Sequence, residues 1–561
     1  MKKKVKNLCL WDIISILVLA VMLVSCAPPA QTPTAPPSTE AAPAAATSAP
    51  AAAATEAPTV PPAAPTSSVK QVLTVNYRIA NAGLDPAIEQ ADSGMQMLSA
   101  VYDRLVVLDS KMEVQPQLAE SWEASPDAKT FTFHLVPNVK FHDGTTLDAN
   151  AVKLSFERVL DPQLMSMFSS DYSMVDSIEA VDAKTVRFNL TYPFAAFIRA
   201  VGLPGGMIVC PSAVEKWGKD FNQHGCGSGP FMVDKFVQGE RMEVVRFNDY
   251  WRGPAKLERI IYTYISDEQA RLSAFIAGEI DLETNIPGPL LPLVKDNPDI
   301  TVLRGPAMMV EYIGLNTEDP IFKDKLVRKA IGYAIDMESL IKNVMGGVGV
   351  YASQPVSPMA FGYNPNIKPF PYDPEKATEL LEEAGWKDTN NDKILEKDGQ
   401  PFKTKFCIMS IPQMVQFAQG TQAFLKAVGI DATIETLDWG AYLDSASKGL
   451  CPIFELGDGA NNGDADSVLW MDFHSSMIPA SNWTFYNNPA FDDLLKQERQ
   501  EVDPEKRLEL LNKAIEMAVD DAPWIPTWTR ENLQAAHNKV KGYELNPSTS
   551  YINLYPVWIE Q

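Results

Sequence analysis

Asp464 and Asp466, two carboxylates close together in the chain, are candidates for acid–base chemistry. A retaining glycosidase needs two carboxyl groups about 5 Å apart, and these two residues qualify only by their proximity in the sequence. The sequence has no nucleophile elbow, no phosphate-binding glycine loop and no HExxH zinc motif. We therefore predict no catalytic residues and do not expect an enzyme.

Oxygen-bearing side chains at the spacing of an EF-hand loop begin at Asp388. Positions 1, 3, 5 and 9 are Asp388, Asn390, Asp392 and Glu396. Positions 6 and 12, which a calcium loop fills with Gly and Glu, are a lysine and a glycine here. A polar hairpin is the favoured interpretation, so we predict no metal site and no cofactor, although calcium binding by residues 388–399 stays open.

Cysteines beyond the N-terminal region are few: Cys210, Cys226, Cys407 and Cys451. In an oxidising compartment an even number suggests pairs, with three possible connectivities. Cys210 and Cys226 lie on either side of a predicted helix, and we predict that they form a disulfide. Cys407 and Cys451 each lie in an apolar, strand-like run, so a second bridge and two buried free thiols are both open. Without a CxxC motif or a His/Cys cluster, structural zinc is not expected.

The N-terminus indicates the compartment. Lysines precede an apolar run over residues 13–24, and twelve helical residues span only about 18 Å, too short for a bilayer core of about 30 Å. This pattern is typical of an export signal. The run ends in Leu-Val-Ser-Cys26, which resembles the lipobox of bacterial lipoproteins. That resemblance implies a signal peptide over 1–25 and a diacylated Cys26, hence an extracytoplasmic protein that is lipid-anchored to the cell membrane, on the periplasmic side or at the cell surface.

Residues 26–68 are predicted to be a disordered linker. Beyond Cys26 they are almost entirely Ala, Pro, Ser and Thr, which cannot bury a core.

The formal net charge of the whole chain is −23 at pH 7, which disfavours nucleic acid as a partner. Its length of 561 residues suggests two or more domains. We expect contact with the membrane through the lipid only.

Strand and helix patterns alternate along the rest of the chain. This alternation predicts an α/β protein whose mostly parallel sheet is covered by helices. The expected strands are 73–77, 131–135, 186–190, 402–409, 431–436 and 452–456. The expected helices are 93–102 with Ser93 as a cap, 148–160, 212–221, 324–345, 373–384 and 412–428.

A series of short motifs over residues 70 to 561 follows a known order. The motifs are Leu84-Asp-Pro, Val101-Tyr-Asp-Arg-Leu-Val, Gln117-Leu-Ala-Glu-Ser-Trp, Val139-Lys-Phe-His-Asp-Gly, Ala151-Val-Lys-Leu-Ser-Phe-Glu-Arg, Gly227-Ser-Gly-Pro-Phe, Asn248-Asp-Tyr-Trp-Arg-Gly, Gly278-Glu-Ile-Asp, Gly314-Leu-Asn-Thr, Val327-Arg-Lys-Ala-Ile-Gly-Tyr-Ala, Tyr372-Asp-Pro-Glu-Lys-Ala and Leu380-Leu-Glu-Glu-Ala-Gly-Trp. Each motif is weak alone, but together and in order they resemble the oligopeptide, dipeptide and nickel-type solute-binding lipoproteins of ABC importers, family 5.

The resemblance implies the large, cluster C form of the two-lobed type II periplasmic-binding-protein fold. Lobe one would combine a core subdomain with an extra subdomain, and the chain would cross twice to lobe two. Solute would bind between the lobes and stabilise their closed arrangement. The implied boundaries are 69–105, 200–310 and 529–561 for the core of lobe one, 106–199 for the extra subdomain, and 311–528 for lobe two.

The resemblance also implies which residues contact the solute. They come from the loop after Leu84-Asp-Pro, from an aromatic residue before the last helix of lobe two, and from the loop after the next strand. The aromatic offers a flat face for stacking, and the last loop is rich in Asn and Asp. The implied residues are Gln90, Ala91, Asp92, Trp439, Asn461, Asn462 and Asp464.

One departure from the family bears on the solute. Peptide-binding members place an aspartate for the α-ammonium group where this chain has Asn461, and an amide carries no charge. A peptide remains the first expectation, since Asp458 could restore the charge, with an oligosaccharide as the alternative and other solutes below both. The expected partners are that small solute and an ABC permease, with the receptor as a monomer. A stand-alone sensor or adhesin of the same fold is the alternative from another class.

Overall fold

The residues that the computed structural model describes are 70–78, 82–89, 91–460 and 462–560. The predicted signal peptide, Cys26, the whole predicted linker, Gln90 and Asn461 lie outside these described residues. Within the described part, each helix is too short or too polar to cross a lipid bilayer.

One large mixed sheet runs through the described part of the chain. Its strands are β1 (Val72–Tyr77), β8 (Phe231–Val237), β9 (Arg241–Arg246), β10 (Arg259–Tyr264), β11 (Leu282–Glu283), β12 (Ile300–Leu315), β13 (Val350–Tyr351), β16 (Lys403–Met409), β17 (Asp431–Leu437), β18 (Ile453–Gly459) and β19 (Trp524–His537). They are ordered β17-β16-β18-β12-β19-β11-β1-β10-β9-β8, with β13 on β19. The prediction of a mostly parallel sheet is wrong, because the central strands β12 and β19 run antiparallel to their neighbours.

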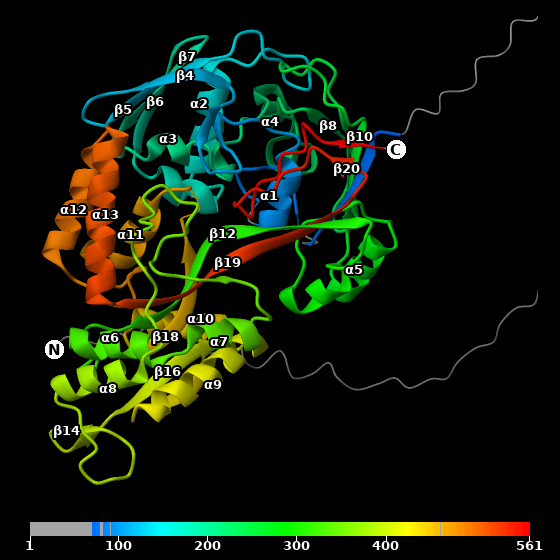
Figure 1. Cartoon of the computed structure of the whole chain (residues 1–561). Coiled ribbons are helices and arrows are strands. Elements are labelled where there is room, and N and C mark those ends of the chain that lie inside the picture. Colours follow the sequence, from blue (N-terminus) through cyan, green and yellow to red (C-terminus); the bar gives the residue numbers. More distant parts are fainter. Residues whose placement is uncertain (1–69, 79–81, 90, 461, 561) are drawn as a thin grey trace, which may run out of the picture. The chain divides into compact units, whose positions relative to one another are not determined.

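Strands β12 and β19 form a long two-stranded ribbon across the molecule (Figure 1). Their register starts at Ile300 opposite His537 and reaches Gly314 opposite Trp524. The register shifts between Pro306 and Val310, so the ladder is irregular near its middle. An irregularity of this kind bends a strand locally and increases its twist.

A separate sheet, ordered β4-β5-β7-β6, occupies the region predicted as an extra subdomain. Apolar residues alternate along β5 and β7 and are buried on one face of this sheet, and helix α2 packs against β6 and β7. Asp148 caps α2 by accepting hydrogen bonds from the backbone N–H groups of Asn150 and Ala151. The elements are β4 (Ala119–Ala124), β5 (Thr130–Leu135), α2 (Ala149–Leu160), β6 (Val175–Asp182) and β7 (Thr185–Leu190).

Helices cover the second half of the sheet. They are α6 (Lys325–Ala334), α7 (Met337–Asn343), α8 (Pro374–Glu383), α9 (Pro412–Ala427), α10 (Trp439–Ser447), α11 (Ala465–Phe473), α12 (Pro489–Gln500) and α13 (Pro504–Asp521). The single helix predicted over 324–345 is wrong. Ile335 takes an extended conformation and Asp336 caps a new helix, accepting a hydrogen bond of 3.0 Å from the N–H of Ser339.

Two predictions in the first half also need correction. The helix predicted over 212–221 ends early, because Gly218 adopts a φ of 49°, which starts a 3₁₀ turn. The residue at the cap of the first helix is Ala91 rather than Ser93. The remaining helices are α1 (Asp92–Leu98), α3 (Phe197–Ala200), α4 (Pro211–Trp217) and α5 (Glu268–Ile276), and the remaining short strands are β2 (Val106–Leu108), β3 (Val114–Pro116), β14 (Glu396–Lys397), β15 (Gln400–Pro401), β20 (Val540–Lys541) and β21 (Trp558–Ile559).

Asp103 connects motifs that are far apart in the sequence. Its buried carboxylate accepts hydrogen bonds from Gln117 Nε2 (2.8 Å), Trp251 Nε1 (3.0 Å), Ser228 Oγ (3.2 Å) and the Tyr250 hydroxyl (3.2 Å). Burial raises the pKa of Asp103 to about 6, against the opposing effect of these donors. The quoted motifs around these residues therefore meet at one buried polar centre.

Two disulfides stabilise the fold. Cys210 is bonded to Cys226, with Cα atoms 5.4 Å apart, beside α4. Cys407 in β16 is bonded to Cys451, just before β18, with Cα atoms 5.6 Å apart. The question that the sequence left open for Cys407 and Cys451 is answered by this second bridge, which ties two neighbouring parallel strands together.

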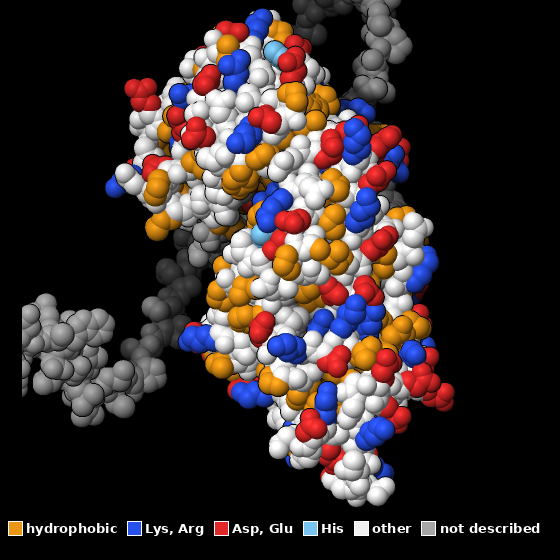
Figure 2. Space-filling view, turned by 90° about the vertical axis from the view of Figure 1, so that its left-hand side faces the viewer, with side chains coloured by type: hydrophobic (Ala, Val, Ile, Leu, Met, Phe, Trp, Pro, Cys, Tyr) orange, Lys and Arg blue, Asp and Glu red, His pale blue; other side chains and the backbone are white. Residues whose placement is uncertain are grey.

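The surface carries both signs of charge. On the face in Figure 2, Lys and Arg side chains lie among Asp and Glu side chains, with apolar side chains between them. Acidic side chains on this face are therefore interspersed with basic ones.

Candidate functional site

The carboxyl ends of two parallel strands point toward the middle of the β12–β19 ribbon from one side. β1 runs parallel to β11, and β11 pairs with β19 through Leu282 opposite Ala536 and Glu283 opposite Ala535. Moving toward the carboxyl end of β11 therefore moves along β19 from His537 toward Arg530. The loops that follow β1 and β11 open at this edge.

The carboxyl ends of three other parallel strands point toward the same place from the opposite side. β18 pairs with β12 from Ile453 opposite Leu315 to Gly459 opposite Met309, so it ends beside the ribbon's irregular middle. β16 runs parallel to both of its neighbours, β17 and β18. From Ala535 to Arg530 the ribbon covers about 17 Å, at about 3.3 Å per residue. We call the carboxyl ends of β1 and β11 one carboxyl edge and those of β16, β17 and β18 the other. The two carboxyl edges thus converge on one stretch of the ribbon, and α/β sheets bind ligands at the carboxyl ends of their strands.

Trp439 lies at the edge formed by the carboxyl ends of β16, β17 and β18. It is the first residue of α10, directly after β17, and Asp438 caps the helix by accepting a hydrogen bond of 3.0 Å from the N–H of Ala441. The Trp439 residue is 53% exposed, and its ring stacks on that of Tyr442 at 6.1 Å. After β16, at the same edge, Ile411 is 44% exposed. Ile411 was not among the predicted contacts, because an isolated apolar residue gives no signal in the sequence.

Asn462 and Asp464, also predicted to contact solute, are both buried. Asn462 accepts a hydrogen bond of 3.0 Å from the N–H of Asp464. The two carboxylate oxygens of Asp464 accept hydrogen bonds of 2.7 Å from Arg507 Nη1 and Nη2, and one of them also caps α11 through the N–H of Asp466. Asp464 is fully occupied by these contacts, so its evident task is to hold the loop after β18 in shape.

The loop that contains Gly463 packs against the region 106–199. Gly463 adopts a φ of 70°, and a Cβ added there would lie 3.0 Å from Arg199 Nη1 and 3.1 Å from Met112 Cε. Arg199 Nη1 donates a hydrogen bond of 2.7 Å to the Met112 carbonyl, and its guanidinium lies 5.4 Å from the centre of the Phe361 ring. The loop therefore lies at a contact between two segments that are far apart in the sequence.

The predicted residues at the opposite edge follow β1. Asp92 is exposed at the start of α1, and Ala91 precedes it. Glu89, in the same loop, accepts hydrogen bonds from the N–H groups of Gly83 (2.7 Å) and Ala91 (2.8 Å), which fixes the course of the loop. Arg78 follows β1 directly and feels the charge of Asp92. Arg78 was not among the residues predicted to contact the solute.

Buried carboxylates line the ribbon near the end of β18. Arg530 pairs with Glu311, which lies in β12, and the carboxyl group of Glu455 in β18 is completely buried. Burial, followed by the repulsion of Glu311, raises the pKa of Glu455 well above its ordinary value. Gly457 makes room for this arrangement, since a Cβ there would lie 2.6 Å from Glu311 Oε1. Burial therefore favours the neutral form of Glu455, which lies beside the Glu311–Arg530 ion pair.

The acid–base alternative has no support from the geometry of Asp464 and Asp466. Each carboxylate forms two hydrogen bonds with an arginine, Asp464 with Arg507 and Asp466 with Arg499. Burial alone would raise the pKa of Asp466, but Arg499, Glu498 and Arg507 together outweigh it and hold that pKa below its ordinary value. A general acid needs a raised pKa instead. These residues are arranged to stabilise the structure rather than to transfer protons.

The EF-hand-like segment forms a loop that leads into the β14–β15 hairpin. Carboxylate oxygens of Asp388, Asp392 and Glu396 lie within 4.8 Å of one another. The oxygens of Glu396 already accept hydrogen bonds from Thr389 and Asn390 inside the loop. The loop thus provides its own donors for its most buried carboxylate.

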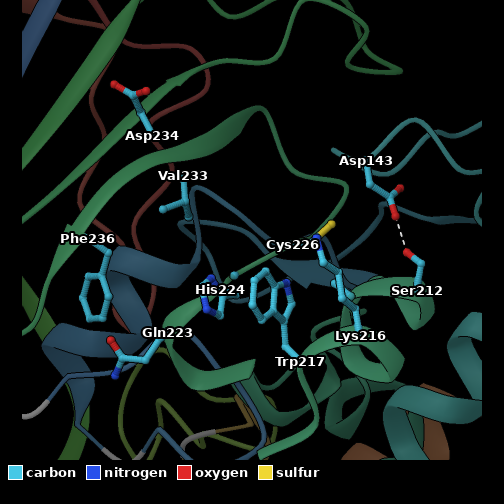
Figure 3. A pocket seen from close by; sticks show the side chains of 12 residues that line it. Asp143, Ser212, Lys216, Trp217, Gln223, His224, Cys226, Val233, Asp234 and Phe236 are labelled. Atoms are coloured by element: carbon cyan, nitrogen blue, oxygen red, sulfur yellow. Dashed lines mark hydrogen bonds between the residues drawn. The ribbon is translucent and has the colours of Figure 1, made fainter. Parts of the chain in front are cut away.

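A cavity of about 440 Å³ lies elsewhere, next to the Cys210–Cys226 disulfide (Figure 3). Trp217 and His224 stack in it with ring centres 3.5 Å apart, and Ser212 donates a hydrogen bond to Asp143 at its rim. The residues that line this cavity do not include the loops at either carboxyl edge.

Comparison with known proteins gives an independent result. The family described as bacterial extracellular solute-binding proteins, family 5 Middle, matches residues 113–480. The glutathione-binding protein GsiB of Escherichia coli K12 is 32% identical over 477 residues, which cover 83% of this chain and 91% of that protein.

Solved structures match over most of the chain. HbpA2 from Haemophilus parasuis has a TM-score of 0.81 and 28% identity, covering 87% of this chain and 100% of that one. The periplasmic binding protein DppA from Helicobacter pylori, in complex with the peptide STSA, has a TM-score of 0.68 and 29% identity, covering 87% and 98%. At nearly equal identity and coverage, this chain superposes better on HbpA2.

Proposed function

We propose, from the premise that this chain belongs to family 5 of the bacterial extracellular solute-binding proteins, that it captures a peptide-like solute between two lobes and delivers it to a permease. The chain is an extracytoplasmic solute-binding receptor of an ABC importer, and the resemblance and fold class predicted from its sequence are confirmed. The observation that carries the proposal is the convergence of two carboxyl edges on the β12–β19 ribbon.

The proposed mechanism is a hinge motion about the ribbon. Strands β11 and β1 attach to one end of it and β18 to the other, so a bend at the irregular middle would bring the two carboxyl edges together. A solute that contacts both edges only when they are close stabilises the closed arrangement by its differential affinity. The permease would then recognise the closed receptor, and no covalent step is needed.

The domain boundaries given above belong to this proposal. One hydrophobic cluster joins residues of 73–282 with the C-terminal residues 536–559, which supports a discontinuous lobe one. Two other clusters gather residues of 308–528. Leu108 and Met112 join the last of these clusters, so the contact between the region 106–199 and lobe two is partly apolar.

A peptide-like solute is favoured by the relatives. One is named a glutathione-binding protein, and DppA was solved with a bound peptide. The proposed contacts are Trp439, Asn461 and Asn462 on lobe two and Gln90, Ala91 and Asp92 on lobe one. Asp464, which the sequence placed among them, would act by positioning the loop.

Attachment to the membrane is a further part of the proposal. Cys26 would carry the lipid and residues 26–68 would tether a monomeric receptor to the cell membrane. Incorporation of labelled palmitate tests this, with Cys26→Ser as the variant that should lose the label and release the protein from membranes.

Native mass spectrometry of the purified protein, followed by a thermal-shift screen of peptides and oligosaccharides, tests the receptor function. A solute at 100 times its Kd stabilises the protein by about 2.7 kcal/mol. A defined small solute that co-purifies and gives this shift supports the proposal. Failure of every peptide and oligosaccharide to give a shift, together with a mass spectrum without any bound solute, would contradict it.

A further inference from the structure

Polar side chains without partners gather at the carboxyl ends of β1 and β11. Three of them are at least nine-tenths buried: Asn76 (2% exposed), Ser93 (3%) and Thr284 (5%). Among the described residues, Asn76 Nδ2, Ser93 Oγ and Thr284 Oγ1 find no hydrogen-bond partner. Asn76 Oδ1 accepts a hydrogen bond of 3.1 Å from the N–H of Thr284, so the ends of the two strands are held together.

Arg78 belongs to the same cluster. It follows β1 and lies two residues after Asn76, on the same face of the strand. In the described part of the chain its guanidinium has no hydrogen bond and no ion pair, and its Nε is buried without a partner. Burial lowers the pKa of Arg78, as does the nearby Arg271, but an arginine stays charged at neutral pH.

The neighbouring acidic groups do not neutralise Arg78 by direct contact. Glu283 accepts hydrogen bonds from Arg271 Nε (3.3 Å) and from the N–H of Asn285 (3.0 Å). Asp92 is exposed at the edge and acts on Arg78 only through its charge. Arg78 is half-buried, and a cation that is partly removed from water without a hydrogen-bonded partner is costly. The cluster therefore provides a positive group and neutral donors that form no hydrogen bond in the described structure, and the nearby Glu283 Oε2 is likewise buried without a hydrogen-bond partner.

We propose that Arg78, with Asn76, Ser93 and Thr284, binds a carboxylate of the solute. The proposal rests on the proposed receptor function, and it defines the class of solute as one with an anionic group directed at lobe one. An arginine suits this task, because its planar fork matches the two oxygens of a carboxylate.

The opposite edge complements this group. Lobe two offers the exposed side chains of Ile411 and Trp439, and the described residues of 409–412, 437–440 and 457–464 include no Lys, Arg or His. A carboxylate would therefore find no positive side chain in these loops. The solute would direct its acidic end to lobe one and an apolar part to lobe two.

Calorimetric titration with paired probes tests the inference. The probes are a panel of tripeptides that includes glutathione, each with a free C-terminal carboxylate, and the same peptides as C-terminal amides. For the tightest peptide we expect the amide to bind about 30-fold more weakly or worse, the loss typical for removing one partner of a buried charged pair. Arg78→Gln should weaken the free acid by a similar factor and leave the amide unchanged.

Controls separate binding from folding. Arg241→Gln, at an exposed arginine of β9 that pairs with Glu243, should leave the ratio of acid to amide unchanged. Arg78→Lys retains the charge and should keep part of the preference, and Thr284→Val removes one donor and should lower acid affinity several-fold. An unchanged ratio in Arg78→Gln, or a tight solute without any anionic group, would overturn the inference while leaving the receptor function intact. Failure of all small solutes to bind would contradict the receptor function itself.

Discussion

Arg199 Nε lies 3.6 Å from a carboxylate oxygen of Asp464, and this pair connects the end of the region 106–199 with the loop that follows β18. Asp464 is completely buried and bonds Arg507 through both oxygens. One carboxylate thus serves two arginines from different segments. We conclude that the loop after β18, which is proposed to contact solute, is held in place by a buried charged network.

Replacement of Asp464 tests this network. Asp464→Asn leaves Arg199 and Arg507 buried with a neutral partner, and removal of one member of a buried charged pair costs about 3–5 kcal/mol. Urea unfolding should show a loss of stability near this range. The matched control Asp388→Asn, at an exposed residue, should stay within about 0.5 kcal/mol of the unmodified protein. A loss below about 1 kcal/mol for Asp464→Asn would contradict the structural role.

The pH dependence of stability tests the buried centre at Asp103. Its pKa is about 6 in the folded protein and 3.8 in the reference state, so the folded protein binds the proton more tightly. Below about pH 4 the group is protonated in both states. Between pH 4 and pH 6 the unfolded chain ionises first, so stability falls as pH rises, by about 3 kcal/mol in total.

Asp103→Asn cannot ionise and should lack this fall. The measurement is the free energy of unfolding of both proteins at pH 4, 5, 6 and 7, and the expected result is that their difference changes by about 3 kcal/mol over the series. Parallel curves would show that the carboxyl group of Asp103 ionises normally in the folded protein.

Substitution of Trp439 separates binding from folding. The side chain is half exposed, so Trp439→Ala should change the free energy of unfolding by less than about 0.5 kcal/mol. If the ring stacks on the solute, affinity should fall about 10-fold, and Trp439→Phe should restore most of it. Titration calorimetry with the tightest peptide of the screen measures both. Unchanged affinity in Trp439→Ala would remove this residue from the site.

The disulfide between Cys407 and Cys451 closes a longer loop than the one between Cys210 and Cys226, with sequence separations of 44 and 16. Restriction of the unfolded chain therefore predicts that the double variant Cys407→Ala/Cys451→Ala loses about 4 kcal/mol, against about 3 kcal/mol for Cys210→Ala/Cys226→Ala. Urea unfolding under non-reducing conditions gives both values. An equal or reversed order would show that strain or residual structure dominates.

The sequence predicted much of the fold because its patterns are local. The alternation in β5 and β7 and the cap at Asp148 are readable from a few neighbouring residues. The predicted helix over 324–345 fails because Asp336 competes for the backbone as a new cap. The antiparallel direction of β12 and β19 depends on pairing across more than 200 residues, which no local pattern encodes.

The candidate site was less predictable for the same reason. Trp439 was implied by the family resemblance, and its place shortly after the predicted strand 431–436 put it at a strand end. That Asp464 bonds Arg507, 43 residues later, and that Arg78 has no partner, are properties of the folded chain. An unsatisfied group is visible only when all its neighbours are known.

The distance between the two carboxyl edges tests the central claim most directly. Spin labels at Gln269 and Gln416, exposed residues in helices that begin at the two edges, would report it by pulsed electron resonance, and labels at Lys403 and Gln416 would report a distance within lobe two. We predict that a saturating solute shortens the first distance and leaves the second unchanged. A first distance that stays the same in the solute-bound protein would contradict capture by closure of the lobes.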